Sequence, residues 1–331
     1  MTRLERLQQW LQRQFPDQHI DLAPASSDAS FRRYFRLRLD DGSTRIAMDA
    51  PPPQEDCRPF IKVAGLLTGA GVHAPNVLAE DIDQGFLLLD DLGQTTYLDA
   101  LKQGDPDALF RDATDALLKW QLATRSDVLP PYDETLLRRE LALFPDWYVA
   151  RHLGRQLSEA QRAALDETFA LIVRSNLAQP AVFVHRDYMP RNLMLSEPNP
   201  GVLDFQDAVL GPISYDVVSL FKDAFLSWDE ERVLDWTIRY WEKAKRAGLP
   251  VDRDFSVFFR DCEWMGLQRH LKVLGIFARI NYRDGKPHYL ADTPRFVGYV
   301  RSTAGRYREF GPLLRLLDEL EGQAAQPGYT F

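Results

Sequence analysis

The hydrophobic pattern of the chain changes near residue 93, and this change restricts the folds open to it. Before that point, residues 30–39 (SFRRYFRLRL) alternate apolar with basic side chains, which is typical of a half-buried strand. The pair Asp41-Gly42 predicts a hairpin turn, and residues 44–50 predict the strand that returns from it. The prolines from Pro51 to Pro53 end that strand. The first quarter therefore contains a small antiparallel sheet.

Helices and further strands complete the chain. Residues 2–15 and 59–71 predict helices in the first quarter, and residues 74–93 predict two short strands. After Gly93 the pattern is mostly helical, with helices expected at about 97–125, 133–151, 158–178, 214–227, 229–247, 254–275 and 305–321, and short apolar strands AVFV, NLML and VLDF among them. This order predicts an α+β, bilobal fold. We expect residues 1–93 to form a smaller, β-rich lobe and residues 94–331 a larger, helical lobe.

The composition is that of an ordinary globular protein of 331 residues with a net charge of −8. This acidic balance argues against broad nucleic-acid binding, which needs a basic face. The two cysteines, Cys57 and Cys262, predict neither a disulfide framework nor a zinc site. The first fifteen residues lack the long apolar core of a secretory signal, and no apolar run approaches the length of a membrane span. We therefore expect a cytoplasmic protein with no membrane or stable protein partner.

The segment VHRDYMPRNLM (184–194), followed by VLDFQD (202–207), points to phosphoryl transfer from ATP. This reaction needs a carboxylate that orients the attacking hydroxyl and oxygen ligands that hold Mg²⁺ on the phosphates. Asp187 is the candidate for the first role, and Asn192 and Asp204 are the candidate metal ligands. His185 more often supports such a loop through hydrogen bonds than it performs chemistry.

The same segments argue against a protein substrate. They resemble the protein-kinase motifs H-R-D-x-x-x-x-N and D-F-G, with Gln206 in place of the glycine. Only a few residues separate Asp207 from the helix that begins with YDVVSLF, and no A-P-E motif is present. The chain therefore has no room for an activation loop and a peptide-docking segment.

The combination of H-x-D-x-x-x-x-N, a compact D-x-x-D and a helix that opens with YD resembles the aminoglycoside phosphotransferase family of small-molecule kinases. This resemblance extends over nearly the whole chain and implies the protein-kinase-like fold with ATP and Mg²⁺ as cofactors. It also implies that residues 1–93 form the nucleotide-binding lobe and residues 94–331 the catalytic and substrate-binding lobe. It assigns Asp216 a structural role beside the catalytic loop. It also implies that the backbone of Leu89, Asp90, Asp91 and Leu92 is the hinge that binds adenine.

Several segments, among them SSDASFRRYFRL, LLLDDLG and GLQRHLKVLGIFARI, resemble the anomeric sugar kinases of bacterial cell-wall recycling more closely. The resemblance implies ATP-dependent phosphorylation of N-acetylmuramate and N-acetylglucosamine at the C1 hydroxyl. Two alternatives stay open. One is a kinase for an aminoglycoside or another amino alcohol, which needs an acidic pocket. The other is a nucleotide-binding regulator without catalysis.

Two features depart from the general kinase plan. Met48 lies near the position of the phosphate-binding lysine, so Arg32, Arg33, Arg45 and Lys62 become candidates to replace it. No glycine-rich run separates the first two strands, and SSDAS (26–30) takes its place. We expect hydroxyl and backbone N–H groups of Ser26, Ser27 and Ser30 to contact the nucleotide phosphates.

The lactyl carboxylate of N-acetylmuramate requires a cation in the substrate pocket, which arginine can bind through two hydrogen bonds. One predicted helix and its extension carry the candidates Gln268, Arg269, His270, Lys272, Arg279 and Arg283. A solvated basic helix face is the other interpretation of this pattern. Trp264 and Tyr282 could stack on a sugar, although we expect Trp264 to belong to the core.

Overall fold

The computed structural model describes residues 1–26 and 31–322. The chain folds into two compact units, each built from two separate stretches of sequence. Unit 1 contains Met1–Ala123 and Pro190–Ala208, and unit 2 contains Thr124–Met189 and the residues from Val209 onward. The boundary predicted at residue 93 separates a nucleotide-binding lobe from a substrate-binding lobe, and this functional division stays a prediction. The two compact units have other boundaries.

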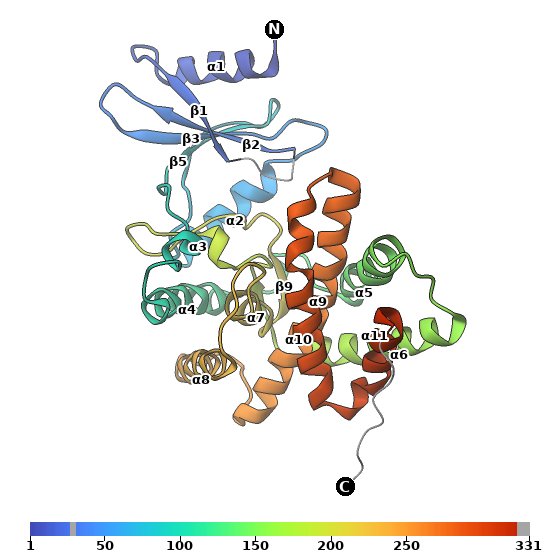
Figure 1. Cartoon of the computed structure of the whole chain (residues 1–331). Coiled ribbons are helices and arrows are strands. Elements are labelled where there is room, and N and C mark those ends of the chain that lie inside the picture. The colour runs from blue at the N-terminus through green and yellow to red at the C-terminus, as the bar shows by residue number, and fades with distance from the viewer. Residues whose placement is uncertain (27–30, 323–331) are drawn as a thin grey trace. The chain divides into compact units, whose positions relative to one another are not determined.

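Unit 1 contains an antiparallel five-stranded sheet in the order β1-β2-β3-β5-β4 (Figure 1). Its strands are β1 (Asp21–Ser26), β2 (Arg33–Arg38), β3 (Thr44–Asp49), β4 (Val77–Asp81) and β5 (Phe86–Asp90). The predicted hairpin is confirmed, because β2 pairs with β3 and Gly42 turns between them at a φ of 80°. Glycine adopts this left-handed conformation without the steric cost of a Cβ atom.

Helix α1 (Arg3–Gln14) covers one face of this sheet (Figure 1). It begins with a capping box, in which Thr2 and Glu5 bond to each other's backbone N–H. Its buried face packs against apolar strand residues, so that one cluster contains Leu7, Trp10, Leu11, Leu37, Ala47, Phe86 and Leu88. Because side chains alternate along a strand, Met48 points to the opposite face from Ala47.

The rest of unit 1 contains α2 (Arg58–Gly69), α3 (Tyr97–Ala100), α4 (Pro106–Leu122), η2 (Pro190–Asn192), β7 (Leu193–Met194) and β8 (Gly201–Val202). The single helix predicted at 97–125 is wrong, because the chain leaves the helical path between α3 and α4. Pro106 has no N–H with which to continue a helix, and Asp105 caps the new one by accepting the N–H of Asp107. The strands predicted around NLML and VLDF are present but shorter.

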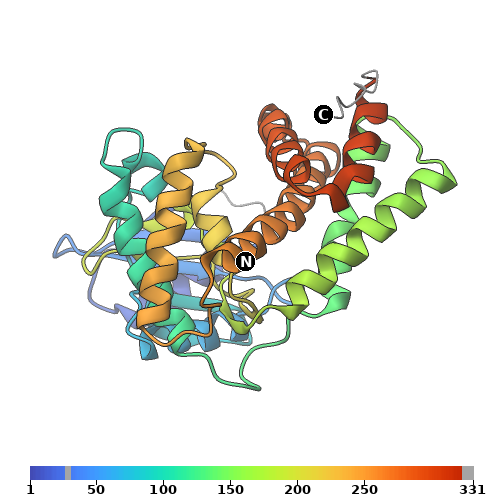
Figure 2. The ribbon, with the colours of Figure 1, turned by 90° about the horizontal axis from the view of Figure 1, so that it is seen from below.

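Unit 2 combines a two-stranded ribbon with helices. Strand β6 (Ala181–Val184) is the predicted AVFV strand, and it pairs antiparallel with β9 (Val209–Pro212), which the sequence did not predict. The helices are α5 (Glu134–Leu141), α6 (Glu159–Ala178), α7 (Tyr215–Phe221), α8 (Glu230–Arg246), α9 (Phe255–Asp284), α10 (Thr293–Arg306) and α11 (Gly311–Glu321). Helix α11, in dark red, lies beside the yellow-green α6 in Figure 2.

Several predicted helices of unit 2 need correction, and the one predicted at 214–227 ends already at Phe221, as α7. The helix predicted at 133–151 is α5 followed by the π-helical segment η1 (Phe144–His152), where Pro145 interrupts α-helical bonding. The helix predicted at 305–321 begins only at Gly311, after α10 and the short turn η4 (Arg308–Phe310). A second short turn, η3 (Pro287–Asp292), follows α9, which runs nine residues beyond its predicted end.

Helix α9 packs closely against η1 at Gly275. A Cβ atom at this position would lie 2.3 Å from the carbonyl carbon and oxygen of Leu143. Glycine therefore allows the two backbones to approach to a distance that other residues would prevent. This contact fixes α9 next to the segment that follows α5.

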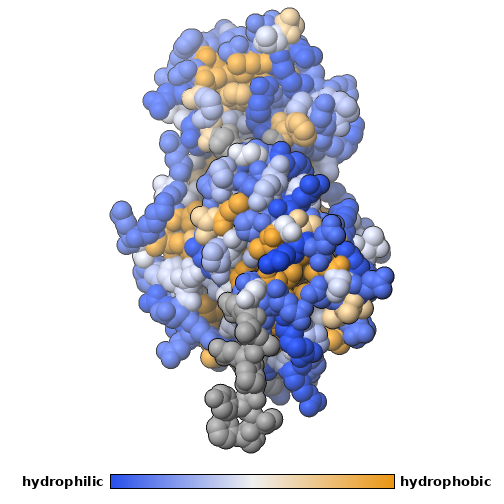
Figure 3. Space-filling model, turned by 45° about the vertical axis from the view of Figure 1, so that its right-hand side comes forward, coloured by the Kyte–Doolittle hydropathy of each residue, from blue (hydrophilic) through white to orange (hydrophobic). Residues whose placement is uncertain are grey.

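The surface in Figure 3 is mainly hydrophilic and carries scattered apolar patches, in agreement with the 27% of charged residues. Within the described residues, no helix has both the length and the apolar character needed to cross a membrane.

Candidate active site

The catalytic-loop motif begins where β6 ends. Strand β6 is apolar and its last three residues are buried, which fixes the start of the loop in the interior of unit 2. Arg186 then adopts a φ of 77°, an uncommon left-handed conformation for a residue with a side chain. Asp216, at the start of α7, stabilises this turn by accepting the backbone N–H groups of His185 at 2.6 Å and Arg186 at 3.0 Å.

Asp216 itself has no exposed surface. Burial raises the pKa of its carboxyl group to about 7, although the N–H groups of His185 and Arg186 act in the opposite direction. His185 is also buried, and its Nδ1 accepts the backbone N–H of Asp187 at 3.3 Å. Asp187 as a whole residue is partly buried. Hence the backbone of the candidate base is held by the side chain of His185.

The side chain of Arg186 reaches a second buried carboxylate, Glu140 on α5. Arg186 donates to Glu140 at 2.6 Å, and Lys272 from α9 donates to it at 2.8 Å. Burial favours the neutral acid, but Lys272 and Arg186 lower the pKa of Glu140 to about 2. Tyr132 and Gln268 donate further hydrogen bonds to the same carboxylate. This polar cluster, which also includes Tyr215, links α5, α7 and α9 to the catalytic loop.

The candidate metal ligands lie in unit 1. The amide nitrogen of Asn192 donates to Asp204 at 3.3 Å, and the backbone N–H of Leu203 donates to the carbonyl of Asn192 at 2.9 Å. Asp204 has a φ of 63°, and its second oxygen accepts the Gln206 amide at 2.9 Å. One carboxylate and one amide oxygen fit Mg²⁺, which keeps much of its coordination shell for phosphate and water.

The sequence matches the model of the family described as "Phosphotransferase enzyme family" over residues 21–254. The chain belongs to this phosphotransferase family. Among its relatives, proteins named N-acetylmuramate/N-acetylglucosamine kinase are 57% identical in Pseudomonas aeruginosa and 50% identical in Neisseria meningitidis. The first alignment covers 96% of this chain and 97% of the relative, and the second covers both fully.

Solved structures of other phosphotransferases have the same fold as this chain. A putative aminoglycoside phosphotransferase from Ralstonia eutropha has a TM-score of 0.60 at 16% identity, and covers 90% of this chain and 96% of its own. A GDP complex of an aminoglycoside 2'-phosphotransferase has a TM-score of 0.59 at 16% identity, and covers 93% and 100%. The predicted α+β, protein-kinase-like fold is thereby confirmed.

The predicted adenine hinge of the phosphotransferase begins with the last two residues of strand β5 and extends beyond its end. Leu89 and Leu92 are buried, and Asp90 accepts hydrogen bonds from Asn76. Asp91 accepts two hydrogen bonds from Arg36, at 2.6 and 3.0 Å. Of the predicted phosphate-binding serines, Ser26 ends β1, whereas Ser27 and Ser30 lie outside the described residues. Nucleotide binding by these residues stays a prediction.

The predicted substrate residues of the phosphotransferase all lie on α9 but do not form one exposed face. Gln268, Arg269, His270 and Lys272 are buried, Arg279 is partly buried, and Arg283 is exposed and pairs with Asp284. Gln268 and Lys272 meet Glu140, so the structure gives these two a place in the polar cluster. Sugar binding by the six residues stays a prediction.

Sequence reasoning missed Glu140, Tyr132 and Tyr215. The available signal was a glutamate at position 140 next to Leu141 and three residues after Leu137, on the apolar face of its helix. Such a carboxylate is rarely buried without a charged partner. Trp264 is buried and packs against the rings of Tyr307 and Phe310, as expected for a core residue.

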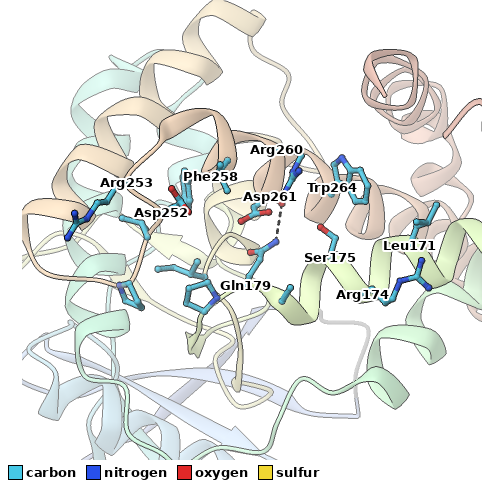
Figure 4. A pocket seen from close by; sticks show the side chains of 16 residues that line it. Leu171, Arg174, Ser175, Gln179, Asp252, Arg253, Phe258, Arg260, Asp261 and Trp264 are labelled. Carbon is cyan, nitrogen blue, oxygen red and sulfur yellow. Dashed lines mark hydrogen bonds between the residues drawn. The ribbon is translucent and has the colours of Figure 1, made fainter. Parts of the chain in front are cut away.

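Unit 2 also contains a pocket of about 880 Å³ between α6 and α9 (Figure 4). Pro180 and Ile213 line it at the end of the β6–β9 ribbon opposite to His185, so the catalytic loop lies elsewhere. Figure 4 shows the Gln179 amide donating to the backbone carbonyl of Asp261, at 3.2 Å. Burial raises the pKa of the Asp261 side chain to about 6, and the nearby Asp252 adds to this effect.

Proposed function

We propose that this phosphotransferase is an ATP-dependent sugar kinase that phosphorylates the anomeric C1 hydroxyl of N-acetylmuramate and N-acetylglucosamine in peptidoglycan recycling. The observation that carries this proposal is the name shared by relatives that are 50–57% identical over nearly their whole length. Solved relatives of the same fold contain ADP or GDP, which supports a nucleoside triphosphate as the phosphoryl donor. The names of the relatives give the sugars and the kinase activity, whereas ATP as the donor and C1 as the position of phosphorylation are our proposal.

The residues of the candidate site have distinct roles in this reaction. Asp187 orients the C1 hydroxyl and accepts its proton late, because the loose transition state requires little deprotonation of the nucleophile. Asn192 and Asp204 would hold Mg²⁺, which neutralises charge on the phosphate oxygens when it is bound. Asp216 and His185 hold the backbone of the loop before Asp187. We propose that the enzyme acts in the cytoplasm on free sugar and ATP.

An amino-alcohol or aminoglycoside acceptor is the second candidate, supported only by the fold of the solved neighbours. They include aminoglycoside phosphotransferases, an ethanolamine kinase and a choline kinase, at 9–16% identity. A likeness at this level concerns the fold, whereas the sugar-kinase relatives match this chain closely in sequence.

The test is ³¹P NMR of the purified protein with MgATP and, in separate samples, N-acetylmuramate, N-acetylglucosamine, kanamycin and choline. We expect a sugar 1-phosphate signal in the first two samples. The signal should disappear in Asp187→Asn, while ATP still raises the melting temperature of this variant. A product only with kanamycin or choline contradicts the proposal. A catalytically active Asp187→Asn variant contradicts the assignment of the base.

A further inference from the structure

The kinase plan uses a lysine on the third strand to bind nucleotide phosphates, and this chain has no such lysine. Met48 lies near the expected position on β3 and has no exposed surface. An apolar thioether cannot bind phosphate oxygens. If the chain binds ATP as proposed above, another cation of unit 1 takes over this role.

Ion pairs and strand geometry argue against two of the candidates, Arg33 and Arg45, and against the neighbouring Arg36. Arg33 forms an ion pair with Asp49, which also pairs with Arg3 at 2.6 Å. Arg45 lies two residues from Ala47 and so points to the α1 side of the sheet, away from the face of Met48. On the face of Met48, Arg36 is held by Asp91 through two hydrogen bonds. These arginines therefore stabilise the sheet and its edges.

Arg32 differs because carboxylates of the predicted metal-binding segment act electrostatically on its guanidinium group. It immediately precedes β2, and its Nε lies 3.3 Å from the Oε2 atom of Glu55. Both side chains are largely buried, with 14% and 17% of their surface exposed. Burial disfavours the charged guanidinium of Arg32, but nearby Tyr34, Glu55, Asp204 and Asp207 favour it, so that its pKa is raised overall. Arg32 thus forms an ion pair with a largely buried glutamate and also interacts electrostatically with Asp204, a candidate metal ligand.

We propose that Arg32 binds the phosphate oxygens of the nucleotide and that Glu55 positions it, so that this pair replaces the lysine–glutamate pair of other kinases. A guanidinium group carries five N–H donors in one plane, so it can donate to a carboxylate and to phosphate oxygens at the same time. The proximity of Asp204 is consistent with this role, because phosphate and magnesium ligands must lie near each other. The inference rests on the proposed function only in so far as the protein binds ATP, and it does not depend on which acceptor is phosphorylated.

The test measures nucleotide binding without an acceptor sugar. Isothermal titration calorimetry compares the binding of a non-hydrolysable ATP analogue and of adenosine, both with Mg²⁺ present. In Arg32→Gln, the affinity for the analogue should fall at least about tenfold, because a charge-assisted hydrogen bond is lost. The affinity for adenosine should stay the same. Glu55→Gln should give a smaller loss in the same direction.

Arg38→Gln is the matched control, since Arg38 is an exposed arginine on β2, the strand that Arg32 precedes, and its binding constants should equal those of the wild type. Lys62→Gln tests the rival cation on α2. The proposal is wrong if Arg32→Gln binds the analogue normally, if adenosine binding falls equally, or if only Lys62→Gln reduces analogue affinity.

A second measurement uses the wild-type protein, so it does not depend on the folding of a variant. Phenylglyoxal labelling followed by mass spectrometry should show that the ATP analogue, but not adenosine, protects Arg32. Equal labelling with and without the analogue overturns the proposal. A failure to phosphorylate sugars would leave both results unchanged, so the two hypotheses are tested separately.

Discussion

Asp216 binds the backbone of Arg186, whose N–H group donates to the Oδ1 atom of Asp216 at 3.0 Å. The other carboxylate oxygen accepts the N–H of His185. One side chain therefore accepts the backbone N–H groups of both residues that precede Asp187. Neither N–H group belongs to a strand or a helix. The position of the candidate base therefore depends on a residue that need not contact the substrate.

Asp216→Ala should reduce both stability and turnover. The substitution leaves two buried N–H groups without acceptors, and each costs about 1–3 kcal/mol. We expect urea denaturation to show a lower free energy of unfolding and kinetics to show a lower kcat with little change in the KM for ATP. Asp223→Ala is the matched comparison, because Asp223 accepts the N–H groups of Phe225 and Leu226 outside the catalytic loop. Equal losses of kcat in both variants would contradict a positioning role for Asp216.

Glu140→Gln should destabilise unit 2 strongly. The change leaves the cations of Arg186 and Lys272 buried without their carboxylate, and breaking such a pair typically costs about 3–5 kcal/mol. The double variant Glu140→Gln/Lys272→Met should lose less stability than the sum of the two single variants, because it removes both members of one pair. Free energies of unfolding from urea titrations provide the comparison. Strictly additive losses would mean that the two side chains are not coupled.

The sequence predicted the parts of the site that are local in the chain, and it missed those that depend on packing. The loop around Asp187 and the candidate metal ligands Asn192 and Asp204 follow from one motif and a short spacing. Glu140 lies 46 residues before Arg186, and their contact depends on the packing of α5 against the loop. Strand β9 was missed for the same reason, since its four residues become a strand only by pairing with β6. Long-range contacts of this kind leave no periodic signal.

Stability should depend on pH through Asp261, which lies in the pocket between α6 and α9. Folding raises the pKa of this group from 3.8 to about 6, so the folded protein binds the proton more tightly than the unfolded chain. The resulting stabilisation is fully present below pH 4 and is lost as the pH rises through 6. Asp261→Asn removes this dependence. The difference in melting temperature, variant minus wild type, should be more positive at pH 7.5 than at pH 4.5, by on the order of 1–2 °C. The same difference at both pH values would contradict the raised pKa.

The close approach of α9 to η1 predicts opposite effects for two glycine-to-alanine substitutions. A Cβ atom at Gly275 would overlap the backbone carbonyl of Leu143, which cannot rotate away as a flexible side chain can, so Gly275→Ala should destabilise the protein by about 1–3 kcal/mol. Gly298 lies exposed within α10, and a Cβ atom there would have no atom within 4 Å beyond its chain neighbours and its own helix backbone. Gly298→Ala should therefore stabilise the protein by up to about 1 kcal/mol, because alanine favours the helix. Thermal unfolding of both variants is the measurement, and a stabilising Gly275→Ala would contradict the close contact between the two backbones.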